Sequence, residues 1–385
     1  MSQTLLQELS NRDLDWLMAI GKRQKVDGDR LLIKAGHQIA TFYLLIDGSL
    51  TISVSQSSDN ALNWAFAALE DRTTLERDII ELNSGDVAGE DLLVSNRAAS
   101  TNVRTKLPSD LLMIPQQELK AKLQQDISFA ARFYRGVALL LTERLLKLTS
   151  QLRTNRLNLS STGSREVLFA FGRLHDSDID WMVNNGSCQH LRSGSILQQE
   201  GRPAETLYLL LRGLAKVEIA PKAVNPLDSA FAALGTSNNP SLGKEIATVR
   251  PGEFIGEMPF GDTRLASTSV STIEDSLVLA IPGRSLKLKL QQDIGWAARF
   301  EEVVATLAAE RFRDTIARLG YGRNFYSSNE ALEESFSYED ELNLDSLDKL
   351  NLAAARFKWM LDRLQVLGNK NLHPEKPLAN SNSVA

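Results

Sequence analysis

Two stretches of one pattern decide the fold: GEDLLVSNRAAS at positions 89–100 and GEMPFGDTRLAS at positions 256–267. Glycine, glutamate, arginine, alanine and serine keep their places in both, so each residue of the second stretch follows its counterpart by 167 positions. We call these stretches the first and the second cassette. Their recurrence indicates that one structural unit was duplicated within the chain.

The duplication continues on both sides of the cassettes. Upstream, FYLLIDG at 42–48 corresponds to LYLLLRG at 207–213, at an offset of 165 positions. Downstream, LQQDI at 123–127 returns unchanged at 290–294, at an offset of 167 positions. Such a period is several times longer than that of solenoid repeats, which run about 20 to 50 residues. The pattern therefore predicts two tandem domains.

The length and composition of the chain allow two compact domains. It has 385 residues, of which 43% are hydrophobic, and a single domain usually takes about 100 to 200 residues. The stretch between the two copies is rich in serine, asparagine and threonine, which is typical of a linker. We predict a first domain over 1–153, a linker over 154–168, a second domain over 169–319 and a C-terminal segment over 320–385.

Charge and cysteine content argue against several classes of protein. The net charge of -5 and the pI near 5.6 do not suit a protein that binds nucleic acid through clustered lysine and arginine. Cys188 is the only cysteine and the four histidines are scattered, so we expect neither a disulfide within the chain nor a metal site. No apolar run reaches the roughly 18 residues of a membrane span. These features favour a cytoplasmic protein.

Helices are predicted at the start and at the end of each domain. Leu5–Ile20 has helical spacing, and Ser10 stands three residues before Asp13, where it can cap a helix. A long helical run with an apolar stripe covers 116–153, and the matching run of the second copy covers 284–319. Each domain therefore ends in a long helix.

Strands are predicted between these helices. The region from Leu31 to Val54 is rich in leucine, isoleucine, valine and threonine and is interrupted by glycine. Asp47-Gly48 predicts a β-hairpin, because glycine accepts the positive φ of a tight turn. Further strands follow around 79–83, 101–105 and 111–114. The sequence thus predicts a small barrel followed by a long helix twice, in the α+β class and mainly β.

Three kinds of segment do not fit the barrel pattern. AFAAL recurs at 65–69 and 230–234 and predicts a short helix inserted in a loop of each domain. Residues 330–348 carry eight carboxylates and no basic residue, a composition that predicts disorder. An amphipathic helix is predicted over 344–367, followed by a loose tail over 368–385. The amphipathic helix must dock on another surface.

GEFIGEM at 252–258 and its weaker counterpart GDVAGE at 85–90 carry a resemblance to a known family. Together with the order of helix, strands, cassette and long helix, they resemble the cyclic nucleotide-binding domain of catabolite activator proteins, regulatory subunits of protein kinase A and gated channels. The resemblance implies a jelly-roll barrel in each domain. It also implies cAMP or cGMP as the ligand, although the sequence makes no cofactor certain.

The resemblance assigns roles to the residues of each cassette. In the family the cassette is a short helix whose free N-terminal amides hold the cyclic phosphate, an arrangement that helix ends favour. The glutamate accepts the ribose 2′-hydroxyl and an arginine pairs with the phosphate. Alternatively, the glutamates of this chain form ion pairs within the barrel. The candidate ligand-binding residues are Gly89, Glu90, Arg97, Ala98, Gly256, Glu257, Arg264 and Leu265.

Both cassettes depart from the family pattern at the arginine. In the family it follows the glutamate by about nine positions, where this chain has Ala99 and Ala266, whereas Arg97 and Arg264 follow by seven. Without a gap, alanine stands at the phosphate position. A deletion of two residues would restore the arginine but would shorten the cassette helix by about half a turn. We prefer the gapless register, which keeps the alternation of the next strand and resembles a bacterial subclass with an early arginine.

Two functions from different classes fit these features. The chain lacks a nucleophile elbow and a phosphate-binding loop ending in Gly-Lys-Ser/Thr, so we expect no enzyme. The first function is a regulatory protein that senses a cyclic nucleotide or related small anion and passes the signal to a protein partner. The second is an adaptor that has lost the ligand. In both, the long helices or the C-terminal helix would contact a partner protein or a second copy.

Overall fold

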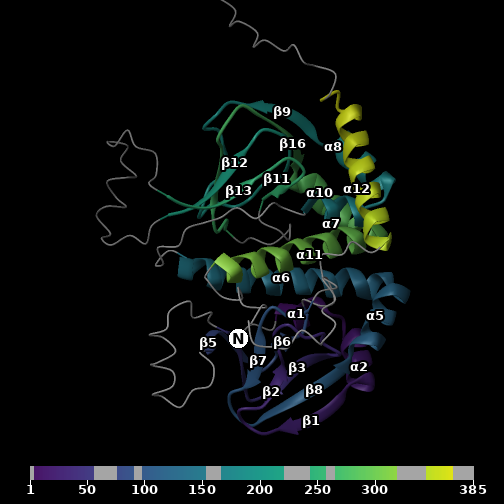
Figure 1. Cartoon of the computed structure of the whole chain (residues 1–385). Coiled ribbons are helices and arrows are strands. Elements are labelled where there is room, and N and C mark those ends of the chain that lie inside the picture. The colour runs from purple at the N-terminus through teal and green to yellow at the C-terminus, as the bar shows by residue number, and fades with distance from the viewer. Residues whose placement is uncertain are drawn as a thin grey trace, which may run out of the picture.

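The computed structural model describes residues 4–55, 76–90, 98–152, 166–220, 243–256, 265–318 and 344–366. We call residues 4–152 the first half and residues 166–318 the second half. Each half ends in a long helix, α6 (Ile127–Leu152) in the first and α11 (Ile294–Arg318) in the second. These two helices lie side by side across the middle of the molecule, and the strands of the two halves lie on opposite sides of them (Figure 1). The predicted fold class, two tandem barrels that are each followed by long helices, is confirmed.

The barrel of each half consists of two antiparallel sheets. The strands of the first half are β1 (Lys22–Val26), β2 (Leu31–Ile33), β3 (Thr41–Asp47), β4 (Ser49–Ser55), β5 (Glu76–Asn83), β6 (Val87–Ala88), β7 (Asn102–Thr105) and β8 (Ser109–Pro115). Those of the second half are β9 (Ser187–Leu191), β10 (Ile196–Gln198), β11 (Thr206–Arg212), β12 (Ala215–Ile219), β13 (Lys244–Val249), β14 (Phe254–Ile255), β15 (Ser269–Thr272) and β16 (Ser276–Pro282).

The strand order is the same in both halves. The sheets of the first half have the orders β1-β8-β3-β6 and β2-β7-β4-β5, and those of the second half have β9-β16-β11-β14 and β10-β15-β12-β13. Each strand therefore has the same neighbours as its counterpart in the other copy. The other helices are α1 (Thr4–Glu8), α2 (Asn11–Ile20), α5 (Gln116–Gln125), α7 (Glu166–Arg173), α8 (Asp176–Asn185), α10 (Gly283–Gln292) and α12 (Leu344–Arg363).

The apolar run of β3 is continuous because both faces of its sheet are buried. Successive side chains of a strand point to opposite faces. Phe42 and Leu44 pack with the helices, in the cluster that contains Phe129 of α6. Tyr43 and Leu45 point the other way, into the cluster that fills the barrel. Tyr43 is therefore a residue of the barrel core.

The predicted hairpin at Asp47-Gly48 is wrong. Strands β3 and β4 flank this glycine but belong to different sheets, so the chain turns a corner between the two sheets. Gly48 has the expected positive φ of 105°, and a Cβ there would lie 2.7 Å from the Cα atom of Ser109. Positive φ at glycine serves either kind of turn. The sequence signal was therefore correct about conformation and wrong about pairing.

Each predicted terminal helix is in fact two helices. Ser10 ends α1 and caps α2, where its hydroxyl and the Asp13 carboxylate form a capping box. The long runs break at matching aspartates, because the Asp126 carboxylate accepts a hydrogen bond of 2.9 Å from the Phe129 amide at the start of α6. Asp293 does the same for Trp296 at the start of α11. A capping side chain within an apolar pattern thus starts a new helix.

The C-terminal amphipathic helix is confirmed as α12, which packs against α7 and α8 on the outer side of the second half (Figure 1). The rings of Phe357 and Phe171 meet edge to face with centroids 5.2 Å apart, and Met360 is fully buried. The Arg356 guanidinium donates to the Asp176 carboxylate at 2.7 Å and to the Phe171 carbonyl at 3.1 Å. These contacts identify the surface on which this helix docks.

The predicted linker and the predicted disordered segment both extend into residues that form helices. Helix α7 begins at Glu166, inside the predicted linker, and α12 begins at Leu344, inside the segment predicted to be disordered. In both cases the hydrophobic pattern of a helix starts before the polar composition ends. The remainder of both segments lies outside the described residues, as do the AFAAL stretches at 65–69 and 230–234 and the tail at 368–385.

Candidate functional site

The first cassette begins where β6 ends. Gly89 has a φ of 92°, and a Cβ at this position would lie 2.9 Å from the Thr41 carbonyl oxygen. Glycine is therefore required both by the backbone conformation and by the close approach of β3. This turn directs the next side chain, Glu90, inward, where only 5% of the residue remains exposed.

Glu90 forms a buried ion pair with Arg144 of α6. One carboxylate oxygen of Glu90 accepts from the guanidinium Nη1 of Arg144, and Nη2 donates to the Val87 carbonyl at 2.6 Å. Burial lowers the pKa of Arg144 to about 10, so its guanidinium stays charged at neutral pH. The ion-pair reading of the cassette glutamate is therefore the one that this structure displays.

Arg144 lines the first pocket and pairs with Glu90, and the sequence reasoning missed it. Its counterpart in the second half is Arg311, at an offset of 167, and the Arg311 guanidinium donates to the Phe254 carbonyl at 2.9 Å. Phe254 is in turn the counterpart of Val87. A matching arginine on the apolar stripe of each long helix was the available signal, since an arginine on a buried face needs a partner.

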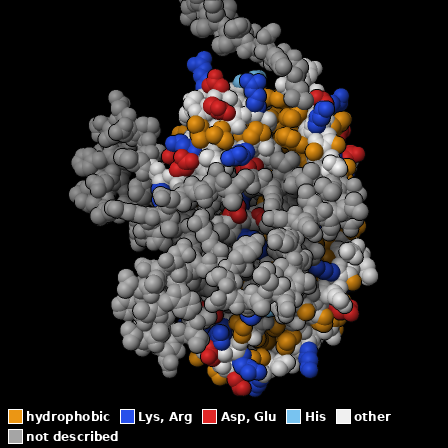
Figure 2. Space-filling view, viewed as in Figure 1, with side chains coloured by type: hydrophobic (Ala, Val, Ile, Leu, Met, Phe, Trp, Pro, Cys, Tyr) orange, Lys and Arg blue, Asp and Glu red, His pale blue; other side chains and the backbone are white. Residues whose placement is uncertain are grey.

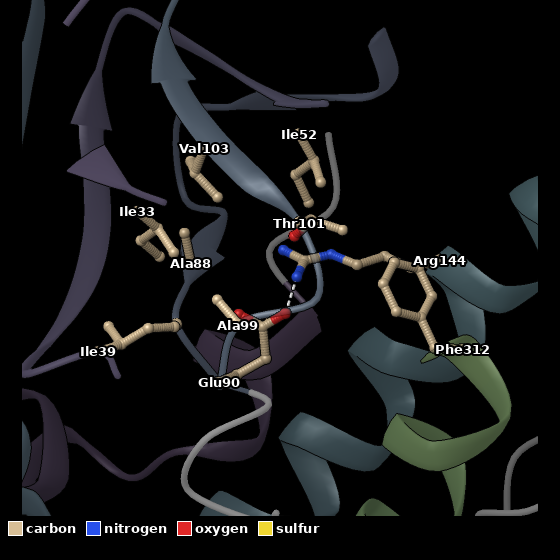
Figure 3. A pocket seen from close by; sticks show the side chains of 11 residues that line it. Ile33, Ile39, Ile52, Ala88, Glu90, Ala99, Thr101, Val103, Arg144 and Phe312 are labelled. Carbon is tan, nitrogen blue, oxygen red and sulfur yellow. Dashed lines mark hydrogen bonds and ion pairs between the residues drawn. The ribbon is translucent and has the colours of Figure 1, made fainter. Parts of the chain in front are cut away.

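A pocket surrounds the ion pair inside the first barrel (Figure 3). Apolar side chains of the barrel form its walls, among them Ile33, Ile52 and Val103. Phe312 closes one side, and it comes from α11 of the second half. The free space is about 20 Å³ for the centre of a water-sized sphere, which is room for about one water molecule. The pocket is therefore almost filled by its own side chains.

The second half also contacts the first cassette directly. The Arg313 guanidinium, next to Phe312 on α11, donates a hydrogen bond of 2.9 Å to the Ala98 carbonyl. Ala99 follows with 2% exposure and lines the pocket, and its amide donates to the His37 carbonyl at 3.0 Å. The walls and the rim of the first pocket are thus assembled from both halves.

Two polar atoms in this pocket have no hydrogen-bond partner in the described structure. They are the second carboxylate oxygen of Glu90, Oε2, and the Nε atom of Arg144, and both are fully buried. Buried polar atoms are paired in most native proteins, so an orphaned pair inside a pocket indicates a position for a missing partner.

The predicted site residues fall into three groups. Gly89, Glu90 and Ala98 come together around the first pocket as just described. In the second half, Gly256 has a φ of 140° at the start of the second cassette, and Leu265 is 56% exposed near its end. The other three predicted residues lie outside the described part of the chain: Arg97, Glu257 and Arg264.

The second barrel has different side chains at the matching place. Ile255 with 2% exposure stands where the first half has Ala88, and Gln198 stands where it has Ile33. Ala266 makes the same backbone hydrogen bond as its counterpart Ala99. The Gly201 amide donates to the Ala266 carbonyl at 2.8 Å, and the Gly36 amide donates to the Ala99 carbonyl. The two cassettes end in the same backbone geometry, although the residues inside the barrels differ.

The described residues contain neither a metal-binding cluster nor a membrane-spanning helix. Within them, no group of three histidine, cysteine, aspartate or glutamate side chains is placed to hold a metal ion. None of the helices described is both long and apolar enough to cross a bilayer. On the face shown in Figure 2, basic and acidic side chains alternate over both halves.

The second half matches the family model of the cyclic nucleotide-binding domain over residues 188–293. No curated protein matches the chain. Among solved structures, the regulatory domain of Toxoplasma gondii protein kinase A with cAMP is 15% identical, covers 76% of this chain and 89% of its own, and has a TM-score of 0.27. The Thermus thermophilus catabolite activator protein is 15% identical, with coverages of 49% and 75% and a TM-score of 0.31.

A third similar structure is the regulatory subunit of a cAMP-independent protein kinase A from Trypanosoma cruzi bound to guanosine. It is 14% identical, with coverages of 76% of this chain and 81% of its own, and its TM-score is 0.26. The family match and the cassette at 252–258 coincide in the second half, where the β-barrel and its closing helices have been described. Residues 188–293 are therefore similar to the cyclic nucleotide-binding domain, and the cassette motif at 252–258 lies within that match.

Proposed function

We propose that this chain is a non-enzymatic regulatory protein whose first pocket binds a small ligand and whose helices pass the event to a protein partner. The observation that carries the proposal is that both long helices reach into one pocket. Arg144 enters from α6 and Phe312 from α11. Any occupant of the pocket therefore contacts both helices at the surface where the halves meet, which we call the seam.

Ligand binding must be coupled to the seam for a steric reason. The described pocket has room for about one water molecule, so a larger ligand enters only if lining side chains such as Phe312 or Arg144 move. Phe312 lies next to Arg313, which is hydrogen-bonded to the first cassette at Ala98. A ligand that favours the displaced arrangement shifts the equilibrium between two packings of the seam. The energy of that shift is what a partner could sense.

The C-terminal helix offers a surface for such a partner. Its inner face is buried against α7 and α8, whereas Leu352 and Trp359, seven positions apart on the outer face, are 44% and 43% exposed. Residues seven apart lie on one side of a helix. A protein partner or a second copy of the chain could cover this face.

The alternative function is a ligand-independent adaptor. It is favoured by one observation, namely that the Glu90–Arg144 pair neutralises the buried charge of the pocket without any ligand. In this alternative the pair serves only to hold α6 against the barrel. The exposed face of α12 would then act alone in assembly.

Calorimetric titration of the full chain separates the two functions. The ligands to test are cAMP, cGMP, adenosine and guanosine, because they span the family's expected ligands and their phosphate-free counterparts. The regulatory proposal predicts saturable binding of at least one of them, with one high-affinity site per chain. If none of the four binds in saturable fashion, the regulatory proposal is wrong and the adaptor remains.

A further inference from the structure

The described lining of the first pocket has no net charge. It contains one acid and one base, Glu90 and Arg144, which are paired with each other. The other lining residues are apolar, apart from Gly89 and Thr101. At the position where the gapless register aligns the family's phosphate-binding arginine, the wall consists of the Ala99 methyl group.

A phosphate would be poorly accommodated in this lining. Burying an anion is unfavourable unless a cation or several donors compensate for the lost hydration. The only cation among the described lining residues is Arg144, and turning it toward a phosphate would leave the buried Glu90 carboxylate without its partner. A phosphodiester would therefore bring a second negative charge to a lining whose one described cation is already paired with Glu90.

An uncharged ligand with hydrogen-bond donors would satisfy what the pocket lacks. Glu90 Oε2 is buried, lines the pocket and has no partner in the described structure, so it can accept from a hydroxyl or an amine of the ligand. Ile33, Ile52 and Val103 offer apolar surfaces to a flat heterocycle. Figure 3 shows these groups around one space, with Glu90 and Arg144 meeting inside it.

We infer that the first pocket selects a neutral nucleoside over the corresponding cyclic nucleotide. The inference rests on the proposed function, because it names the ligand class of the same site. In this arrangement a ribose hydroxyl donates to Glu90 Oε2 while the base packs against the apolar walls. Phe312 must turn aside to admit the ligand, because the closed pocket has no room for a base.

Paired titrations test this inference. Adenosine is compared with cAMP, and guanosine with cGMP, by calorimetry on the full chain at one ionic strength, so that the members of each pair differ in the phosphate. The inference predicts that one nucleoside binds about tenfold or more tightly than its cyclic nucleotide. Equal or tighter binding of the cyclic nucleotides overturns the ligand class and leaves the regulatory proposal standing. Absence of binding by all four overturns both.

A charge-changing variant provides the matched control. Glu90→Gln removes the negative charge and leaves Arg144 as a free cation in the pocket, so cyclic nucleotide affinity should rise relative to nucleoside affinity by about tenfold. Because a buried unpaired arginine can unfold the barrel, the double variant Glu90→Gln, Arg144→Met is measured beside it. That variant is neutral and should keep the preference for nucleoside. A preference for cyclic nucleotide in the double variant contradicts the inference.

Arg97 of the first cassette is the remaining cation to test, since it lies outside the described residues. Arg97→Ala should leave the ratio of nucleoside to cyclic nucleotide affinity unchanged. A loss of cyclic nucleotide binding in this variant, together with tight binding in the native chain, would show that a phosphate is held by the cassette arginine and would overturn the inference.

Discussion

The carboxylate of Glu301 in the second half lies 3.5 Å from the Nη1 atom of Arg135 in the first half, and both residues belong to the seam between α6 and α11. Arg135 is shared, because its Nε atom donates to the Glu8 carboxylate at 2.9 Å. Glu301 is 2% exposed and its Oε2 atom has no hydrogen-bond partner in the described structure. Burial consequently raises the pKa of Glu301 to about 7.

This raised pKa predicts a seam that weakens with increasing pH. The folded chain holds a proton on Glu301 that the unfolded chain, in which the group has its ordinary pKa of 4.5, releases at lower pH. The stabilisation is therefore present below pH 4.5 and is lost as the pH rises through 7. The free energy of unfolding of Glu301→Gln, relative to that of the native chain, should therefore be about 2 kcal/mol higher at pH 8 than at pH 5.5. Urea unfolding at both pH values measures the difference.

Glu118→Gln is the control for this substitution, since Glu118 is exposed on α5. Its stability relative to the native chain should change little between the two pH values. Equal pH profiles for the native chain and Glu301→Gln would show that Glu301 is not protonated in the seam near neutral pH.

Phe312→Ala should open the first pocket from the second half. The truncation removes the side chain that a ligand would have to displace, so ligand affinity should rise by about tenfold, while the fold loses about 3 kcal/mol from the vacated core space. Ile316→Ala is the matched control, because Ile316 packs in the same cluster one turn further along α11 without lining the pocket. Calorimetry should detect the gain only in Phe312→Ala. The same gain in both variants would mean that general loosening of the core is responsible.

Phe357→Ala should loosen α12. Phe357 is half-buried and meets the Phe171 ring, so its truncation should lower the stability of this docking by about 2 kcal/mol. Hydrogen exchange of the α12 amides should accelerate, whereas that of the barrels should not. Lys358→Ala on the exposed side of the same helix should leave the rates unchanged. Equal exchange in Phe357→Ala and the native chain would contradict the observed docking.

Much of the fold could be predicted because its signals are local or repeated. The run at 42–46 is apolar at successive positions, which indicates a strand buried on both faces, and its return at 207–211 indicates a second barrel. Pairing is not a local property, and this is why Gly48 predicted a turn correctly but a hairpin wrongly. The helix breaks at Asp126 and Asp293 were missed because a capping side chain interrupts the backbone without interrupting the apolar stripe.

The candidate site could be predicted only in part. Glu90 stands in a recognisable motif, but its partner Arg144 lies 54 positions further on, on a helix whose rotation about its axis sequence periodicity does not determine precisely enough. The place of Phe312 in the first pocket could not be predicted from the sequence for a different reason. It belongs to the other copy, and the way in which two duplicated domains pack depends on complementary surfaces that no single motif encodes.

The central claim is that occupation of the first pocket repacks the seam, and hydrogen exchange tests it most directly. Exchange at the amides of α6 and α11 is measured with and without saturating adenosine or guanosine, and cAMP or cGMP serves as the comparison. The account predicts that the nucleoside which binds changes exchange in both helices, including α11 near Phe312, although α11 belongs to the other half. A change confined to the first barrel, with α11 unaffected, would contradict it.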